Sequence, residues 1–78
     1  MREYVLGAND ILAVAVFDEP QPPGTYVIGA EGKMAMPLIG TIGAAGLTVH
    51  QLRDLIAEKL GAYIRDPVVN VQLLRNNT

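Results

Sequence analysis

The sequence predicts a small α+β domain, in which short strands precede one helix and a final strand follows it. Three observations support this fold class. Residues 11–17 form an apolar run rich in β-branched side chains, residues 48–63 repeat apolar side chains every three or four positions, and residues 68–74 alternate apolar and polar side chains. The order of these segments predicts a small mixed or antiparallel sheet with one helix packed on it, mostly in the order β-β-β-β-α-β.

The N-terminal part of the chain divides at its turn-forming residues. Residues 4–6 predict a short extended segment. Residues 7–10 predict a turn, because glycine and asparagine accept a positive φ and aspartate bonds readily to nearby backbone amides. The apolar run 11–17 is then expected to be a strand covered on both faces.

Prolines and glycines divide the middle of the chain. Three prolines make residues 18–24 a loop, because each of them removes a backbone hydrogen-bond donor. Further strands are expected at residues 25–28, 33–36 and 38–43, with a turn at residues 29–32 between the first two. Gly40 and Gly43 interrupt the last of these strands, which predicts a bulge or a close backbone contact there.

The clearest helix starts after Thr48, which is a favourable N-cap residue. Gln51 lies three positions further on and completes a predicted capping box. The apolar stripe of this helix consists of Val49, Leu52, Ile56, Leu60 and Tyr63. The helix is expected to end near residues 63–64, because Pro67 disfavours helical geometry at Asp66.

The last strand is predicted at residues 68–74, with one face open to water. The 78 residues of the chain are enough for one domain. We therefore expect a single domain over residues 1–78, with its core region at 4–74 and a polar tail at 75–78. Because a chain of this size hides only about 60–65% of its surface on folding, its stability margin should be thin.

Composition and charge exclude several classes of function. The net charge is −2 and the six lysine and arginine residues are scattered, whereas a nucleic-acid surface needs clustered basic residues. Without cysteine, the chain forms no disulfide, thiolate nucleophile or cysteine-bound metal site. The longest apolar run is far shorter than the roughly 20 residues of a membrane-spanning helix. Residues 1–3 lead into strand-like sequence without a secretory leader, which leaves a cytosolic protein and an excised piece as alternatives.

No pattern of side chains predicts catalysis, a cofactor or a bound metal. His50, the one histidine, is expected to be a solvated residue in the first turn of the helix. Asp54 and Glu58 are expected on the solvated side of that helix, and Asp18 and Glu19 would point in different directions along an extended segment. The glycines form neither a Walker loop nor a dinucleotide-binding motif.

Asp10 is the polar residue that stands out, because it ends a turn and precedes the most apolar segment. Its carboxylate is expected to accept backbone N–H bonds and hold the turn. A role in binding a ligand is the less favoured alternative.

Short motifs follow one another along the chain. They are Y-x-L-G-x-x-D over residues 4–10, M-P-L-I-G over 36–40, G-L-T over 46–48 and R-D-P-x-V-x-V over 65–71. In their order and spacing they resemble the polysaccharide biosynthesis/export family of outer-membrane polysaccharide export proteins. The positions that carry the resemblance, for which it implies structural roles, are Tyr4, Gly7, Asp10, Gly32, Pro37, Gly40, Gly46, Leu47, Thr48, Asp66 and Pro67.

Three features depart from the family pattern, one of which is that Gly29 and Ala30 replace the more usual polar turn residues. Asn9 stands where the family commonly has glycine, which is a mild change because asparagine also accepts left-handed geometry. Family proteins also usually carry a signal peptide, often a lipidated cysteine, and further domains, and none of these is expected within residues 1–78. The resemblance therefore concerns the fold and role of one domain, and not the membrane anchoring of the protein.

The resemblance implies a non-enzymatic periplasmic domain that forms rings with copies of itself in a capsule or exopolysaccharide export channel. It implies association with the outer membrane through other parts of the parent protein, and an inner-membrane polysaccharide copolymerase and the polysaccharide as partners. The alternative is a monomeric carbohydrate-binding or adaptor module of the cell envelope. Sugar sites generally present aromatic faces with polar groups. Phe17 and Tyr63 are expected to be committed to the core, which disfavours this alternative.

Overall fold

The computed structural model describes residues 4–17 and 24–75. Within them the chain forms β1 (Ile11–Val16), β2 (Gly24–Val27), β3 (Lys33–Met36), β4 (Gly40–Gly43), α1 (Val49–Leu60) and β5 (Val69–Arg75). This order confirms the predicted α+β class and the sequence of elements. The proline-containing segment 18–23, predicted to be a loop, lies outside the described residues.

The strands form two antiparallel sheets rather than the single sheet that was expected. One sheet has three strands in the order β2-β1-β5, and the other is the β3–β4 hairpin. β1 is central and pairs along its length with β5, from Val16 opposite Val69 to Ile11 opposite Arg75, with one register shift between Ile11 and Leu12. All the pairings are antiparallel.

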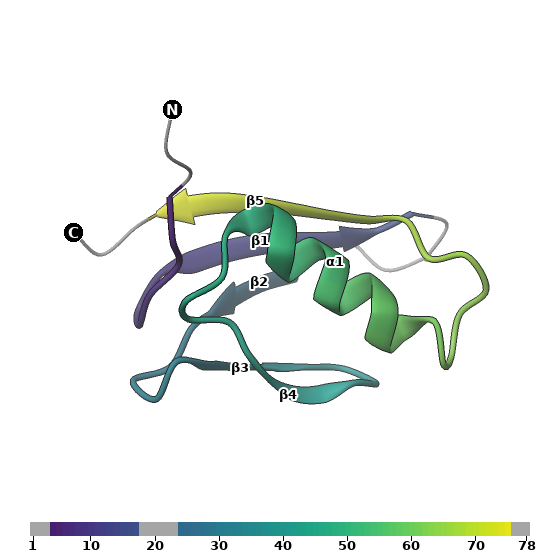
Figure 1. Ribbon diagram of the computed structural model, residues 1–78, viewed down its shortest axis with the longest axis horizontal. Coiled ribbons are helices and arrows are strands. Elements are labelled where there is room, and N and C mark those ends of the chain that lie inside the picture. Colours follow the sequence, from purple (N-terminus) through teal and green to yellow (C-terminus); the bar gives the residue numbers. More distant parts are fainter. Residues whose placement is uncertain (1–3, 18–23, 76–78) are drawn as a thin grey trace.

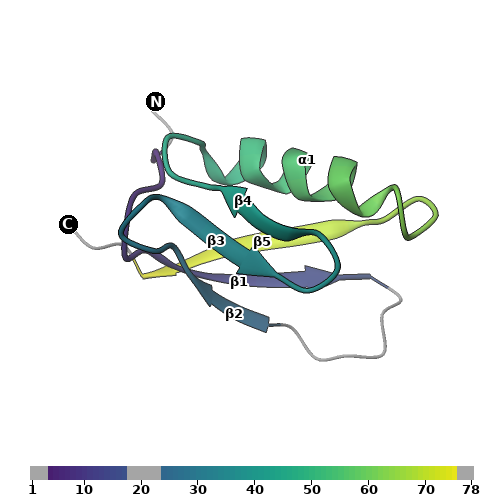
Figure 2. The ribbon, with the colours of Figure 1, turned by 90° about the horizontal axis from the view of Figure 1, so that it is seen from below.

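The helix and the hairpin lie on the same side of the three-stranded sheet. In Figures 1 and 2, α1 runs alongside β5, and the β3–β4 hairpin lies beside it next to β2. The opposite face of the three-stranded sheet is uncovered by the described elements (Figure 2). The core therefore lies between α1, the hairpin and one face of the β2-β1-β5 sheet.

The predicted helix face is confirmed, because Leu52, Ile56 and Leu60 are all buried. Each turn of α1 thus directs one large aliphatic side chain inward, as a spacing of four residues requires. The buried side chains that join them from the strands are Leu12, Val14, Met34, Met36, Ile42, Val69 and Val71.

β1 is not covered on both faces, which corrects the interpretation of its apolar run. Leu12 and Val14 point into the core and are buried, whereas Ala13 and Ala15 are half-buried on the opposite face. Alanine counts as apolar in a sequence pattern, but its small side chain exposes little apolar surface on an open face. The two alanines therefore make the apolar run unbroken, although only one face of the strand is buried. β1 is therefore a strand with one buried and one open face, of the kind that antiparallel sheets commonly contain.

Phe17 and Tyr63 are exposed, which corrects their assignment to the core. Their exposed fractions are 70% and 63%. For Tyr63 the reason is that α1 ends at Leu60, with Gly61 as its C-cap, a few residues earlier than predicted. The spacing of three residues from Leu60 therefore no longer directs Tyr63 towards the core.

The glycines of the hairpin also have a different role from the one predicted. β4 begins at Gly40, and its pairing with β3 contains no bulge. A Cβ atom at Gly40 or Gly43 would meet no heavy atom within 4 Å, so neither glycine marks a close contact. Gly40 instead has a φ of 76° next to the turn at residues 37–39, which favours glycine.

The segment at residues 4–6, predicted to be extended, forms an isolated antiparallel bridge, with Val5 opposite Thr48. At the other end of the chain, β5 begins and ends one residue later than predicted. Within the described ranges, no helix is long and apolar enough to span a membrane.

Candidate functional site

A buried carboxylate organises the N-terminal end of the domain. Asp10 is 1% exposed. Its Oδ2 atom accepts a hydrogen bond from the Tyr4 hydroxyl at 2.8 Å and another from the Gly7 amide at 2.9 Å. The expected bond between the Asp10 carboxylate and a backbone amide is therefore present. We call Tyr4, Gly7 and Asp10 the N-terminal clamp.

The turn inside the clamp follows from its sequence. Asn9 has a φ of 69°, a left-handed conformation that asparagine accepts more readily than most residues. The Asn9 backbone amide donates to the Ile28 carbonyl at 2.7 Å, and the Ile28 amide donates to the backbone carbonyl of Asp10 at 3.0 Å. The turn is thereby joined to the end of β2.

The clamp also changes the acidity of its tyrosine. The hydrogen bond to Asp10 is the main cause that raises the pKa of Tyr4 above its ordinary value. Desolvation and the negative charge of the carboxylate act in the same direction. The clamp is thus built around a protonated phenol that donates to a carboxylate.

The clamp brings the first motif against the segment that precedes the helix. The Leu6 amide donates to the Leu47 carbonyl at 2.8 Å, and the Gly46 amide donates to the Leu6 carbonyl at 2.9 Å. Together with the bridge between Val5 and Thr48, these bonds tie two distant stretches of chain. Gly46 has a φ of 90°, which explains a glycine at this position.

Gly32 connects the hairpin to the same end. Its carbonyl accepts hydrogen bonds from the amides of Ala44 and Ala45 at 2.9 and 3.0 Å. A Cβ atom at Gly32 would lie 2.8 Å from the Cβ atom of Ala45, and its φ is 80°. Both the close approach and the backbone conformation thus require glycine here.

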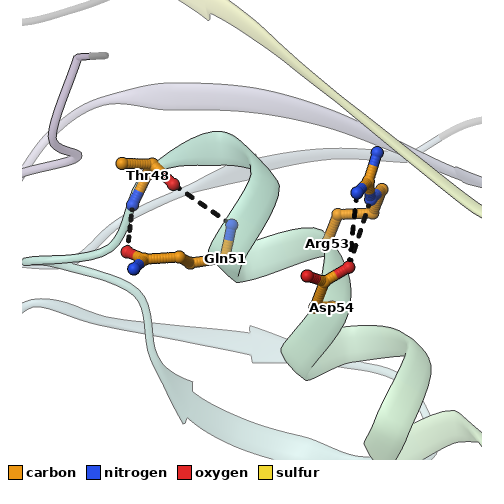
Figure 3. A network of polar contacts seen from close by, with 4 residues as sticks. All are labelled: Thr48, Gln51, Arg53 and Asp54. Atoms are coloured by element: carbon orange, nitrogen blue, oxygen red, sulfur yellow. Dashed lines mark hydrogen bonds and ion pairs between the residues drawn. The ribbon is translucent and has the colours of Figure 1, made fainter. Parts of the chain in front are cut away.

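The start of α1 lies next to this region and carries the predicted capping box (Figure 3). The Gln51 backbone amide donates to Thr48 Oγ1 at 3.2 Å, and the Thr48 backbone amide donates to Oε1 of the Gln51 side chain at 3.0 Å. His50 is exposed in the first turn of the helix, as expected. Asp54 is paired with Arg53 at 3.3 Å on the exposed side.

The structure divides the positions that carry the resemblance between two ends of the domain. Those at the clamp end are Tyr4, Gly7, Asp10, Gly32, Gly46, Leu47 and Thr48. Pro37 and Gly40 lie at the β3–β4 turn, and Asp66 and Pro67 lie in the connection from α1 to β5. Figures 1 and 2 show both of these connections at the end of the molecule away from the clamp. Asp66 has a φ of 49°, which agrees with the expectation that the helix cannot continue through it.

This far end contains two pockets that were not predicted. A pocket of about 250 Å³ has mainly apolar walls, among them Val16, Tyr26, Met36, Leu38 and Leu60. The other, of about 460 Å³, is lined by Ile39, Leu55, Glu58, Lys59, Ala62 and Tyr63. The sequence pattern contained no signal for either pocket, because each joins the hairpin tip to a distant helix end.

The described residues bring together no set of groups typical of a catalytic or metal site. They contain no group of three or more histidine, aspartate or glutamate side chains that could hold a metal ion. Asp18 and Glu19, considered as candidate carboxylates, lie outside the described residues. The chemical features of the described part of the chain are therefore the clamp and the pockets at the far end.

Comparison with known proteins agrees with the motifs. The polysaccharide biosynthesis/export protein family matches residues 1–74, and the chain therefore belongs to this family. It is 30% identical over 94 aligned positions to the EPS I polysaccharide export outer membrane protein EpsA of Ralstonia solanacearum, and equally to EpsA of Ralstonia nicotianae. The alignments cover 91% of this chain and 25% of each relative, so the chain spans about a quarter of their length.

Proposed function

We propose that the chain is a non-enzymatic domain of a polysaccharide export protein, and that it acts in the periplasm as part of a ring-shaped passage to the outer membrane. The observation that carries this proposal is the family match over residues 1–74. Two relatives that share 30% identity with the chain are named as outer-membrane proteins that export a polysaccharide. On this proposal the exported polymer and an inner-membrane polysaccharide copolymerase are its partners.

The dimensions of the molecule support a role that requires several copies. The described chain measures 35 × 27 × 20 Å along its principal axes. A compact body of this size is filled by its own core and cannot surround a polymer. A passage therefore requires copies arranged around an axis, in which a patch on one copy meets a different patch on the next.

Exposed apolar side chains occur at both ends of the domain, as such an arrangement requires. Phe17, Leu38 and Val68 are exposed at the far end, and we call them the far-end patch. Val27 and Leu74 are exposed at the end of β2 and of β5, near the clamp, and we call them the clamp-end patch. Two different apolar patches suit a head-to-tail contact, which closes into a ring when the rotation between copies allows it.

A monomeric carbohydrate-binding or adaptor module remains the second candidate. The exposure of Tyr63 favours it, because that ring was expected to be buried and is instead available to a ligand. Self-assembly distinguishes the two functions, since an adaptor acts as a single copy. A sugar contact is compatible with both.

A deletion tests the proposed function directly. Residues 4–74 would be removed from the full-length protein that carries this chain, and the exported polysaccharide would be measured outside the cells. We expect export to be lost while the remainder of the protein is still present in the envelope by immunoblot. Normal export by a deletion variant present at wild-type level would contradict the proposal.

A further inference from the structure

The larger pocket is built from one stripe of the helix and the tip of the hairpin. Leu55, Glu58, Lys59 and Ala62 recur at intervals of three and four residues, so they lie along one side of α1 and its C-terminal turn. Ile39 of the β3–β4 turn forms the opposite wall. The pocket of about 460 Å³ is therefore a groove between two elements of defined structure.

An aromatic ring lies at the end of this groove with its backbone held in place. The Tyr63 amide donates to the Leu60 carbonyl at 2.8 Å, in the turn that follows α1. The side chain of Tyr63 lines the pocket and is 63% exposed. A large ring that is held by a hydrogen-bonded turn and is not needed in the core is available for contact with a ligand.

The groove also carries both an acceptor and a donor. Glu58 supplies carboxylate oxygens and Lys59 supplies ammonium hydrogens, and both residues are exposed. Within the described ranges neither takes part in the observed ion pair, which joins Arg53 and Asp54. The smaller pocket differs, since its side chains are apolar apart from the Tyr26 hydroxyl.

We propose that this groove binds a short stretch of the polysaccharide, with Tyr63 as the aromatic contact and Glu58 and Lys59 as hydrogen-bonding partners of the sugar hydroxyls. A sugar ring has apolar C–H faces and a rim of hydroxyls that both donate and accept. An aromatic surface beside aliphatic side chains and a few convergent polar groups is complementary to that combination. The inference rests on the proposed function, because polysaccharide export is what makes a saccharide the expected ligand.

Titration of the isotope-labelled chain tests this groove. The probe is a set of short oligosaccharides prepared by partial hydrolysis of the exopolysaccharide that the producing strain secretes. We expect saturable changes of amide chemical shifts at Leu55, Glu58 and Ala62. Tyr63→Ala should weaken binding by about tenfold or more, whereas Tyr63→Phe keeps the ring and should stay within about threefold of the wild type.

Two further variants keep the test decisive. Glu58→Ala changes an exposed helix position to a good helix former and should also weaken binding, which provides a second result if Tyr63→Ala does not fold. Glu31→Ala makes the same change at an exposed residue outside the groove and outside both apolar patches, and should leave binding unchanged.

The outcomes separate this inference from the proposed function. Absence of saturable shifts, or equal affinity of Tyr63→Ala and wild type, would overturn the sugar site. Shifts at the same amides that depend on protein concentration without sugar would show that a second copy occupies the groove, which also overturns it. If export requires residues 4–74 but the sugar site fails, the proposed function stands. If sugar binds but the deletion leaves export intact, the sugar site stands and the export function fails.

Discussion

Among the described residues, Asp10 is the polar side chain that is buried. A carboxylate that is 1% exposed has lost nearly all its contact with water, and burial of this kind requires hydrogen-bonding partners. The Gly7 amide and the Tyr4 hydroxyl are two of these partners, and both belong to the N-terminal segment. The carboxylate therefore joins that segment to the beginning of β1.

We expect Asp10→Ala to lower the free energy of unfolding by about 1–3 kcal/mol, because it leaves the Gly7 amide and the Tyr4 hydroxyl without this acceptor. Asp10→Asn should cost less, since it retains one acceptor oxygen. Urea denaturation measures both effects, and oligosaccharide titration should show unchanged affinity for the folded variants. Loss of sugar binding at an unchanged melting temperature would instead identify Asp10 as a ligand residue.

The raised pKa of Tyr4 predicts a loss of stability at alkaline pH. Because folding raises the pKa of Tyr4, the protonated phenol stabilises the folded chain below the pKa of an unfolded tyrosine, which is about 10. That contribution is lost as the pH rises through the raised pKa, when a phenolate would face the Asp10 carboxylate. Denaturation midpoints measured from about pH 8 to about pH 11 should therefore fall more for the wild type than for Tyr4→Phe. Parallel curves for the two proteins would argue against the clamp.

At the scale of the helix, the capping box makes a prediction about coupling. Thr48→Ala should lower stability by about 1 kcal/mol, because the Gln51 amide loses its acceptor. Thr48→Ala combined with Gln51→Ala should cost less than the sum of the two single changes, since each residue contributes one half of the same box. A double-mutant cycle by chemical denaturation measures this difference. Strictly additive losses would show that the two hydrogen bonds act independently.

The inner face of α1 should be the element most sensitive to truncation. Ile56 has no exposed surface, so Ile56→Ala removes buried methylenes and leaves a cavity that should cost about 2–4 kcal/mol. In a domain with a small total stability, this loss could unfold most of the population. The matched change Leu55→Ala, at a half-buried neighbour, should cost less. A shift for Ile56→Ala under about 0.5 kcal/mol would contradict the packing of this face.

The two ends of the helix show which local signals the sequence carries. The start was predictable because a cap depends on neighbours three residues apart, and Thr48 and Gln51 contain the whole signal. The end was placed too late because Pro67 was taken as the stop, whereas the chain leaves the helix at Gly61. Gly61 keeps right-handed backbone geometry, with a φ of −57°, so it is not the left-handed glycine that often ends a helix, and the low helix propensity of glycine was the signal that the sequence offered.

Exposure was the property that sequence patterns predicted least well. Phe17 was assigned to the core as part of an apolar run and Tyr63 as part of an apolar stripe at helical spacing, but a domain of this size has a large surface relative to its volume. Much of the surface of any small protein is apolar, so an apolar residue is not by itself a buried one. For Tyr63 this difference matters, because it changes the residue from a core element to a candidate ligand contact.

At the scale of the whole molecule, the family could be recognised from the sequence, but the grouping of the motif positions in space could not be predicted. The clamp segment contacts residues 46–48 through backbone bonds, which leave no trace in the pattern of side chains. The division into two sheets was missed for the same reason, since strand pairing depends on partners distant in the chain. The glycines were the partial exception, because Gly32 and Gly46 both have the positive φ that this residue suggests.

Assembly is the property on which the proposed function depends, and the two apolar patches allow a specific test of it. The patches lie at different ends of the domain, so each contact in a ring would join the far-end patch of one copy to the clamp-end patch of the next. Each contact is small, so we expect the 78-residue chain to be monomeric at micromolar concentration. The full-length protein should assemble, because its other regions raise the effective concentration of neighbouring domains.

Opposite charges introduced into the two patches would show whether they meet. Leu38 has a φ of 71°, a conformation that aspartate accepts, and Val27 lies in an edge strand, where lysine is well tolerated. Leu38→Asp and Val27→Lys should therefore each leave the domain folded and weaken the assembly of the full-length protein, as measured by native mass spectrometry in detergent. The double variant should recover part of the assembly, because the introduced carboxylate of one copy would face the introduced ammonium of the next.

His50→Gln, an exposed change outside both patches, serves as the control. Wild-type assembly of both single variants would show that other surfaces form the ring. If the full-length protein is strictly monomeric, and export also continues after deletion of residues 4–74, the adaptor function becomes the better explanation.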